Sequence, residues 1–392
     1  MADVATEIQV FSGSLHSARP REITGRRYRR LISSVFAANA PVMSTSVDLL
    51  LFAAVPNRAM LDQGFYAAEV DGLLAHPRVR SVATTNDLSE VRKAKVDGIV
   101  SYFYSHTAAV AAIGRARGIP VVATGGGEQL LRDPATYART YAARISAFHA
   151  CTLLATRLLA TSTADYERML ALAQLGRDRI ILSFHGVAAV EYADMRHFAH
   201  YRAPASLVTI AGLDTELNVR RKGVLEAVDL LARFYAHDPS ASLTIIGRTT
   251  CRAMVEAHAA ALGLTLQIKF VGYVNETEKL NILHQSRFYV QLSEYEGFGI
   301  GALEALAHGC QVIHTNVGGL RDTIGDYGII VKRDAVDWFD PAVVPPYTLP
   351  DWQRFTTHLA RFAVGHRADT LLRALALNPC DGQDLGAEDG NT

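Results

Sequence analysis

The sequence predicts an α/β protein whose strands form parallel, doubly wound sheets, and three observations lead to this prediction. The chain has 392 residues, which is enough for two domains of ordinary size. Hydrophobic residues make up 49% of it and charged residues 20%, a balance typical of a soluble globular protein. From Val47 onward, short apolar runs alternate with segments of helical periodicity. Such alternation produces parallel strands joined by helices that cover both faces of a sheet.

The first half contains five predicted strands in a regular order: residues 47–55, 79–83, 97–103, 119–124 and 180–184. Helices are expected over residues 65–75, between the third and fourth strands, and over 134–175 with a break near Leu159. Ala160-Thr161-Ser162 at this break has the form of a short strand that ends in a helix N-cap. The polar stretch 191–204 is expected to be a linker. We therefore predict an N-terminal domain over residues 1–200.

The second half repeats the pattern, with predicted strands over residues 206–211, 243–246, 268–271, 288–292 and 328–331. Residues 212–221 are expected to be a loop, and helices are expected from Gly223, over 278–285 and from Ile300. A terminal helix is predicted over 352–377. The second domain is predicted to span residues 201–377, and the Asp- and Gly-rich tail 378–392 is predicted to be disordered.

One stretch of the second half contains candidate ligand-binding residues. The apolar run 288–292 is followed by Gly297 and Gly299 and then by a helix from Ile300 that stops at Gly309. Free amides at the start of such a helix bind a diphosphate. Glu296 and Glu304 would repel phosphate but suit the hydroxyls of sugars on either side of it, which indicates a nucleotide sugar. The alternative is a pair of solvent-facing carboxylates beside an ordinary strand-to-helix turn.

A longer motif surrounds these residues. The run Ser293-x-x-Glu296-Gly297-Phe298-Gly299-x-x-x-x-Glu304-Ala305-Leu306-Ala307-x-Gly309 precedes Gln311-Val312-Ile313 and Asn316-Val317-Gly318-Gly319-Leu320-x-Asp322. In this order the residues resemble the donor-site signature of family 4 retaining glycosyltransferases of GT-B fold. Weaker similarity extends through most of residues 97–330, although Gln311 replaces the family's usual proline. The resemblance implies two Rossmann-like domains that face each other across a cleft, with a terminal helix that crosses back onto the first.

The resemblance also implies roles for individual residues. Lys222 of Lys222-Gly223 would neutralise the donor diphosphate together with an arginine. The family's arginine after the first glycine is replaced by Leu213, so either Arg220 or Arg221 would substitute; a solvated basic turn is the alternative. Glu296 would hold sugar hydroxyls and Glu304 the ribose. The other donor contacts expected are Phe298, Gly299, Ile300, Gly247, Tyr273 and Val274.

The first domain departs from the family on its sugar-facing side. Gly126, within Gly125-Gly126-Gly127-Glu128, stands where many members have a histidine that contacts the transferred sugar. Ligands of doubly wound sheets bind at the carboxyl ends of strands, so Gly64, His106, Gly126 and Glu128 are the acceptor-side or sugar-side candidates. His106 could equally be a structural histidine, and the glycines a flexible connection. His185-Gly186-Val187 resembles the family's Asn-Gly-Val turn.

Neither a metal nor a cofactor is expected. No Asp-x-Asp occurs in the sequence, which makes a metal-bound diphosphate unexpected, and the cations near the donor would do that work. The four cysteines are scattered without a Cys-x-x-Cys pair, so neither a disulfide framework nor a zinc site is suggested.

The predicted function is retaining, metal-independent transfer of a sugar from a donor such as a UDP- or GDP-sugar to an acceptor hydroxyl in glycan or glycoconjugate biosynthesis. The acceptor would be a glycan, a lipid-linked molecule or another molecule with a hydroxyl. Two alternatives remain open. A catalytically silent sugar-nucleotide-binding protein is compatible with Gly126 in place of histidine. A GT-B-like epimerase would convert the donor without an acceptor.

Net charge and targeting signals bear on the partners and the cellular location of the protein. The formal net charge is zero, which gives no indication of nucleic-acid binding. The N-terminus lacks the features of a signal peptide, so a cytoplasmic location is expected. One predicted helix contains Arg26, Arg27, Arg29 and Arg30, and it would either touch anionic lipid headgroups at a membrane surface or form a solvated face.

Overall fold

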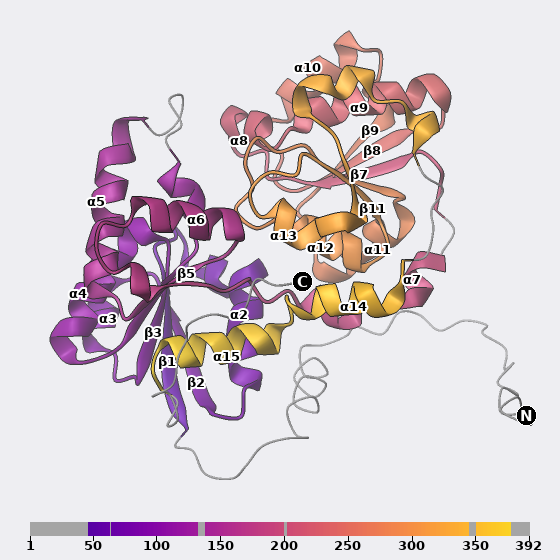
Figure 1. Ribbon diagram of the computed structural model, residues 1–392. Coiled ribbons are helices and arrows are strands. Elements are labelled where there is room, and N and C mark those ends of the chain that lie inside the picture. The colour runs from indigo at the N-terminus through magenta and orange to yellow at the C-terminus, as the bar shows by residue number, and fades with distance from the viewer. Residues whose placement is uncertain (1–45, 63, 132–137, 200–201, 345–349, 378–392) are drawn as a thin grey trace, which may run out of the picture. The chain divides into compact units, whose positions relative to one another are not determined.

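The computed structural model describes residues 46–62, 64–131, 138–199, 202–344 and 350–377 (Figure 1). The four N-terminal arginines and the tail 378–392 lie outside them. Within the described residues the strands form two six-stranded sheets, and every strand pair is parallel. The predicted α/β class with doubly wound parallel sheets is therefore confirmed. The boundaries predicted at residues 200 and 377 stay predictions.

The first sheet has the strand order β2-β1-β3-β4-β5-β6. Its strands are β1 (Val47–Ala53), β2 (Val79–Thr85), β3 (Gly98–Tyr102), β4 (Val121–Thr124), β5 (Arg157–Ala160) and β6 (Ile180–Leu182). The helices of this half are α2 (Gly64–Ala75), α3 (Leu88–Lys93), α4 (Tyr104–Arg117), α5 (Ala138–Leu154) and α6 (Thr163–Leu172). Ser162 accepts a hydrogen bond from the Asp165 amide and is the N-cap of α6, as the sequence predicts.

The second sheet has the order β12-β11-β10-β7-β8-β9. Its strands are β7 (Ser206–Ile210), β8 (Ser242–Ile246), β9 (Ile268–Gly272), β10 (Phe288–Gln291), β11 (Gln311–His314) and β12 (Gly328–Ile330). The helices of this half are α8 (Glu216–Arg221), α9 (Val224–His237), α10 (Arg252–Ala261), α11 (Glu276–Gln285), α12 (Ile300–Ala307) and α13 (Leu320–Ile324). Among the described residues, no helix combines the length and the apolar character needed to cross a membrane.

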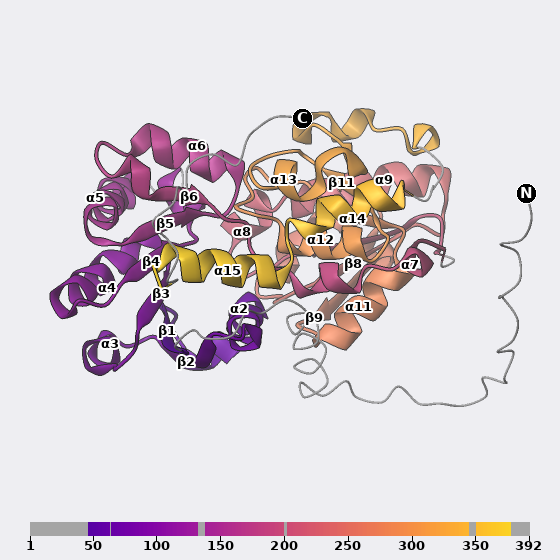
Figure 2. The ribbon, with the colours of Figure 1, turned by 60° about the horizontal axis from the view of Figure 1, so that its bottom comes forward.

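Each sheet has a hydrophobic core on both faces, and successive strand residues point alternately into the two cores. In β1, Leu50 and Phe52 pack into the core that α4, α5 and α6 cover, whereas Leu49 and Leu51 pack into the core on the other face. That second core is completed by α2 and by α15 (Val364–Ala374), the last helix described. Figure 2 shows α15, in yellow, beside the strands of the first half. The last helix that the structure describes thus packs against the first sheet.

Three predicted elements differ from the structure. The segment expected to be a loop over 212–221 contains α8, whose first turn is capped by Thr215. The terminal helix is two helices, α14 (Trp352–Ala360) and α15, because Phe362 turns inward at the break and is fully buried. The polar stretch 191–204 contains the end of a 3-10 helix, η4 (Ala188–Tyr192), and the short helix α7 (Met195–Ala199).

Candidate functional site

A cavity of about 390 Å³ lies at the carboxyl ends of strands from both sheets. On the first-sheet side it is lined by residues at or just beyond the ends of β3, β4 and β5. On the second-sheet side it is lined by the ends of β7 and β10 and by the start of α12. Strand order reverses at β1/β3 and at β7/β10, the points where ligands bind to doubly wound sheets. The lining residues are Phe65, Tyr102, Phe103, Gly125, Gly126, Thr161, His185, Ile210, Arg221, Lys222, Tyr289, Gln291, Glu296, Gly297, Phe298, Gly299, Ile300 and Gly301.

Lys222 reaches this cavity because the chain turns tightly behind it. Lys222 is the C-cap of α8, and Gly223 follows with a φ of 68°. A Cβ at Gly223 would lie 1.8 Å from the carbonyl oxygen of Leu292, so only glycine lets this turn approach the end of β10 so closely. The Lys222 ammonium consequently lies 2.5 Å from Glu296 Oε2.

The Glu296 carboxylate is held by the strand that precedes it. Its Oε2 accepts hydrogen bonds from Lys222, from Gln291 at 3.2 Å and from Ser293 at 3.5 Å. Gln291 is itself oriented by the Tyr289 hydroxyl, which donates to Gln291 Oε1 at 2.9 Å. No described residue donates a hydrogen bond to Oε1 of Glu296, so this oxygen remains available to a ligand hydroxyl.

The backbone of Glu296 is fixed by the second glycine pair of the motif. The Gly319 amide donates to the Glu296 carbonyl at 2.8 Å. Gly318 has a φ of 55°, and a Cβ there would lie 2.0 Å from the same carbonyl oxygen. The Asn316-Val317-Gly318-Gly319 turn therefore packs against the loop that carries Glu296.

The structure distinguishes the two arginines that the sequence left open. Arg221 lines the cavity, and its Nη1 donates to the Tyr295 carbonyl at 3.2 Å. Arg220 is exposed and does not line it, while its own carbonyl accepts a hydrogen bond from Arg333. Two basic side chains, Arg221 and Lys222, thus share the cavity with the positive end of α12.

Some predicted donor contacts lie in the cavity and others do not. Phe298, Gly299 and Ile300 line it, whereas Gly247, Tyr273 and Val274 do not; the Tyr273 side chain is exposed. Glu304 is also outside the lining.

Glu304 is paired with a residue that the sequence analysis missed. Lys279 Nζ in α11 lies 2.7 Å from Glu304 Oε1, and both side chains are nearly buried. Burial raises the pKa of Glu304, an effect that the charge of Lys279 partly offsets. A lysine on a helix has no distinctive sequence signal, so this partner could be found only from the fold.

On the first-sheet side, Gly126 is the one predicted candidate that the described residues place in the lining. Gly126 lines the cavity with a φ of 85°. Gly64 and His106 do not line it, and His106 is an exposed residue in the first turn of α4. Glu128 falls in η2 (Gly127–Leu130), where its side chain is outside the described part of the structure.

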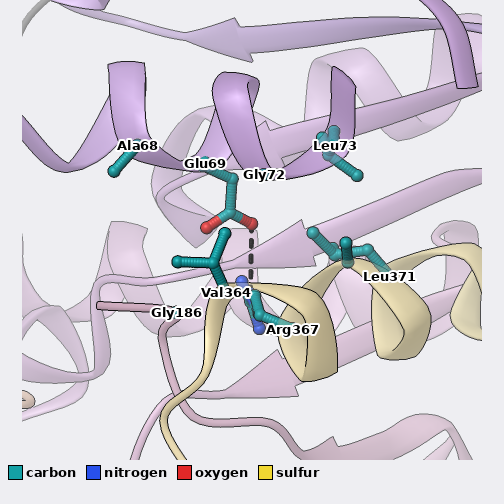
Figure 3. Close-up of a pocket in the computed structure, with 9 residues that line it drawn as sticks. Ala68, Glu69, Gly72, Leu73, Gly186, Val364, Arg367 and Leu371 are labelled. Atoms are coloured by element: carbon teal, nitrogen blue, oxygen red, sulfur yellow. Dashed lines mark hydrogen bonds and ion pairs between the residues drawn. The ribbon is translucent and has the colours of Figure 1, made fainter. Parts of the chain in front are cut away.

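His185 is a polar side chain of this wall that the sequence analysis did not select. Its ring lies 5.2 Å from that of Phe298 and stacks at 6.4 Å on that of Tyr102. Its Nδ1 lies 3.9 Å from Oε2 of Glu69, and Glu69 is bound in turn by Arg367 of α15 (Figure 3). Burial lowers the pKa of His185, so the imidazole is neutral at neutral pH. The available signal was its place in His185-Gly186-Val187, where the resembled family has asparagine.

Two contacts join the first half to the second half, one beside Glu296 and one at α13. Tyr295, next to Glu296, donates its hydroxyl to Asp165 of α6, and Arg168 bonds both groups, at 3.0 Å to the carboxylate and 2.9 Å to the hydroxyl. The amide and hydroxyl of Thr163 donate to Asp322 of α13 at 2.8 and 2.6 Å. The loop that carries Glu296 is therefore tied to α6.

Comparison with known proteins supports the resemblance. Residues 218–340 match the family model described as glycosyl transferases group 1. A glycogen synthase of Mycobacterium tuberculosis is 35% identical over 121 residues, which are 31% of this chain and 28% of that protein. The GDP-mannose:cellobiosyl-diphosphopolyprenol alpha-mannosyltransferase of Xanthomonas campestris is 28% identical over 184 residues, 46% of each chain. The chain thus matches between about a quarter and a half of the length of these relatives.

The fold agrees with these matches. A crystal structure of an Anabaena protein in complex with UDP superposes with a TM-score of 0.60 at 14% identity, and the match covers 84% of this chain and 99% of that one. The GT-B fold expected from the sequence is therefore confirmed, as is the similarity to family 4 glycosyltransferases.

Proposed function

We propose that this chain, similar to family 4 glycosyltransferases in its motifs and GT-B in its fold, is a retaining glycosyltransferase that uses a nucleotide-sugar donor and needs no metal ion. The observation that carries the proposal is the Lys222–Glu296 pair, which places a cation and a carboxylate 2.5 Å apart at the glycine-bearing start of α12. Such a pair offers one partner to a diphosphate and another to sugar hydroxyls.

In the proposed reaction the bond between the anomeric carbon and the donor phosphate breaks, and its electron pair passes to the phosphate oxygen. Lys222, Arg221 and the amides at Gly299 and Ile300 stabilise the charge that develops there. The acceptor hydroxyl attacks the same face of the sugar, and its proton passes to the leaving phosphate. Glu296 holds the hydroxyls of the transferred sugar.

The nucleotide and the acceptor are proposed by class. The names of the similar proteins include a UDP complex and a GDP-mannose-dependent transferase, which supports a UDP- or GDP-sugar donor. We propose that Glu304 accepts hydrogen bonds from the ribose hydroxyls. The acceptor is a hydroxyl of a glycan or glycoconjugate. A neutral His185 and the apolar rings of Tyr102 and Phe298 suit an uncharged sugar more than an anionic one.

The test is a thermal-shift screen of nucleotide sugars on the full chain, followed by assays of transfer and donor hydrolysis with each ligand that stabilises it. A bound donor raises the melting temperature by mass action. Turnover with retention of anomeric configuration supports the proposal. Stabilisation without turnover for any acceptor would favour a silent binder, and conversion of the donor to an epimer would favour an epimerase.

A further inference from the structure

Three histidines converge outside the cavity, on elements that are distant in the sequence. His197 is in α7, His284 is near the end of α11, and His308 is the C-cap of α12. One ring nitrogen from each lies within 4.8 Å of the other two. The ring centroids of the three pairs are 4.6, 4.9 and 5.0 Å apart.

The arrangement is held by the fold. The amide of His308 donates to the Glu304 carbonyl at 3.1 Å, and Arg202 Nη2 donates to the His308 carbonyl at 2.7 Å. The Nδ1 of His308 lies 3.0 Å from Nε2 of His284, so these two nitrogens share one proton. His308 is buried, while His197 and His284 are half-buried, which leaves a route from solvent.

We propose that His197, His284 and His308 bind one divalent transition-metal ion of the zinc class. Imidazole nitrogens are preferred ligands of Zn²⁺, at about 2.0–2.1 Å. In a tetrahedral site with such bonds the ligand nitrogens are roughly 3.3 Å apart. The His284–His308 pair is already near this separation, and small ring rotations bring in His197. Water would supply the fourth ligand.

The neighbouring charges permit a cation here. Burial lowers the pKa of His308 most, and the two other histidines lower it further by their charge. Lys279 and Arg202 follow as smaller contributions of the same sign. The charge of Lys279 is compensated by ion pairs with Glu304 at 2.7 Å and Glu276 at 3.0 Å. The positive field at the triad is therefore weaker than a count of basic residues suggests.

The role assigned to this ion is structural. The site shares no residue with the described lining of the cavity. It joins α7, which follows the first half, to α11 and α12 of the second. Binding to the folded chain alone would raise its stability.

The experiment measures metal binding rather than activity. Full-length protein is dialysed against EDTA, freed of chelator and titrated with Zn²⁺ by calorimetry. We expect one ion per chain, an affinity more than about 100-fold weaker in His197→Ala and His284→Ala, and no change in His366→Ala, an exposed histidine in α15. Removing a hydrogen-bond partner of a metal ligand lowers metal affinity by up to about 100-fold, and removing the ligand itself should lower it further.

A second measurement on the unsubstituted protein avoids reliance on the variants' folding. Co²⁺ added to the stripped protein should give the intense visible absorption of a tetrahedral site, and Zn²⁺ should displace it. Absence of Zn²⁺ binding and of these bands would overturn the proposal. Equal binding by folded His197→Ala, His284→Ala and His366→Ala would also overturn it, because the ion would then be held elsewhere.

Discussion

Lys222 Nζ and Glu296 Oε2 form an ion pair across 74 residues of sequence, with side chains that are 21% and 12% exposed. The pair is short because Gly223 lets the α8–α9 turn reach the end of β10 and because the Gly318–Gly319 turn fixes the loop of Glu296. A donor would compete for both partners at once. Its diphosphate would draw the ammonium and its sugar hydroxyls the carboxylate.

Lys222→Ala should therefore reduce turnover more than donor affinity, since the charge on the leaving phosphate grows as the bond breaks. We expect a loss of about 10²–10³ in rate. Lys222→Arg should recover part of it. Donor dissociation constants from calorimetry and single-turnover rates are the measurements. Equal losses in affinity and rate would make Lys222 a uniform binding group.

Glu304→Gln should weaken donor binding by about 1.5–3 kcal/mol, because a charge-assisted bond to ribose is lost. The substitution also removes the partner of Lys279, so Lys279→Met serves as a matched control for loss of that pair. Calorimetry with the free nucleoside diphosphate isolates the ribose contribution. Unchanged affinity in Glu304→Gln would remove the ribose role.

Transfer should proceed at its full initial rate in EDTA, because Lys222 and Arg221 supply the charge that a metal would otherwise provide. Rates are measured at a temperature well below unfolding, so that loss of an ion from the histidine triad does not unfold the enzyme. His284→Ala should behave like the parent protein in this assay. Activity that is abolished by EDTA and restored by magnesium or manganese would count against metal independence.

We propose that the neutral His185 ring gives the transferred sugar one hydrogen bond. His185→Phe removes this bond, worth about 1.4 kcal/mol, and keeps the ring contacts with Tyr102 and Phe298, so it should slow transfer about 10-fold. His185→Asn, which places the resembled family's residue here, should restore part of the rate. Affinity for the free nucleotide should not change in either variant. Equal loss of nucleotide binding and transfer would indicate a general structural effect.

Glu69→Gln should destabilise the protein by about 3–5 kcal/mol at pH 7, because it leaves Arg367 buried without its partner. Burial alone would raise the pKa of Glu69, but the charge of Arg367 and the contact with His185 hold it at about 2, below the ordinary 4.5. The stabilisation is therefore complete above about pH 4.5 and is lost as the pH falls towards 2.

Urea unfolding at several pH values tests this: the difference between Glu69→Gln and the parent should shrink as the pH falls from 4.5 towards 2. Asp326→Asn breaks the exposed pair with Arg354 and is the control, with an expected cost of about 0–1 kcal/mol. A difference that does not vary with pH would mean that the Glu69 charge is not what stabilises the contact.

Sequence reasoning predicted the sheets well because buried parallel strands appear as short apolar runs between glycine-bearing turns. It failed where local signals were weak or overruled. The capping of α8 by Thr215 was present in the sequence, but a six-residue helix has too little periodicity to stand out from a loop. The break between α14 and α15 has neither proline nor glycine, and burial of Phe362 determines it.

At the site, too, features with a local sequence signal were predictable and contacts between distant segments were not. The glycines and acidic residues of the 293–309 motif occur in one continuous run, so their cooperation was predictable. Lys279 and Glu304 are 25 residues apart, and Glu69 and Arg367 are 298 apart. Such pairs are set by how helices pack, which no local pattern in a single sequence encodes. His185 was visible only as a departure from a resembled motif.

The position of α15 bears on the order in which the chain acquires its structure during synthesis. Leu371 and Leu372 fill one face of a sheet whose strands end at Leu182, and Arg367 completes the ion pair of Glu69. A ribosome has therefore translated the whole second half before this face of the first sheet can close. Until then the emerging strands expose an apolar surface and an uncompensated carboxylate. Emergence of α15, rather than emergence of the first half alone, is thus the step that completes this core.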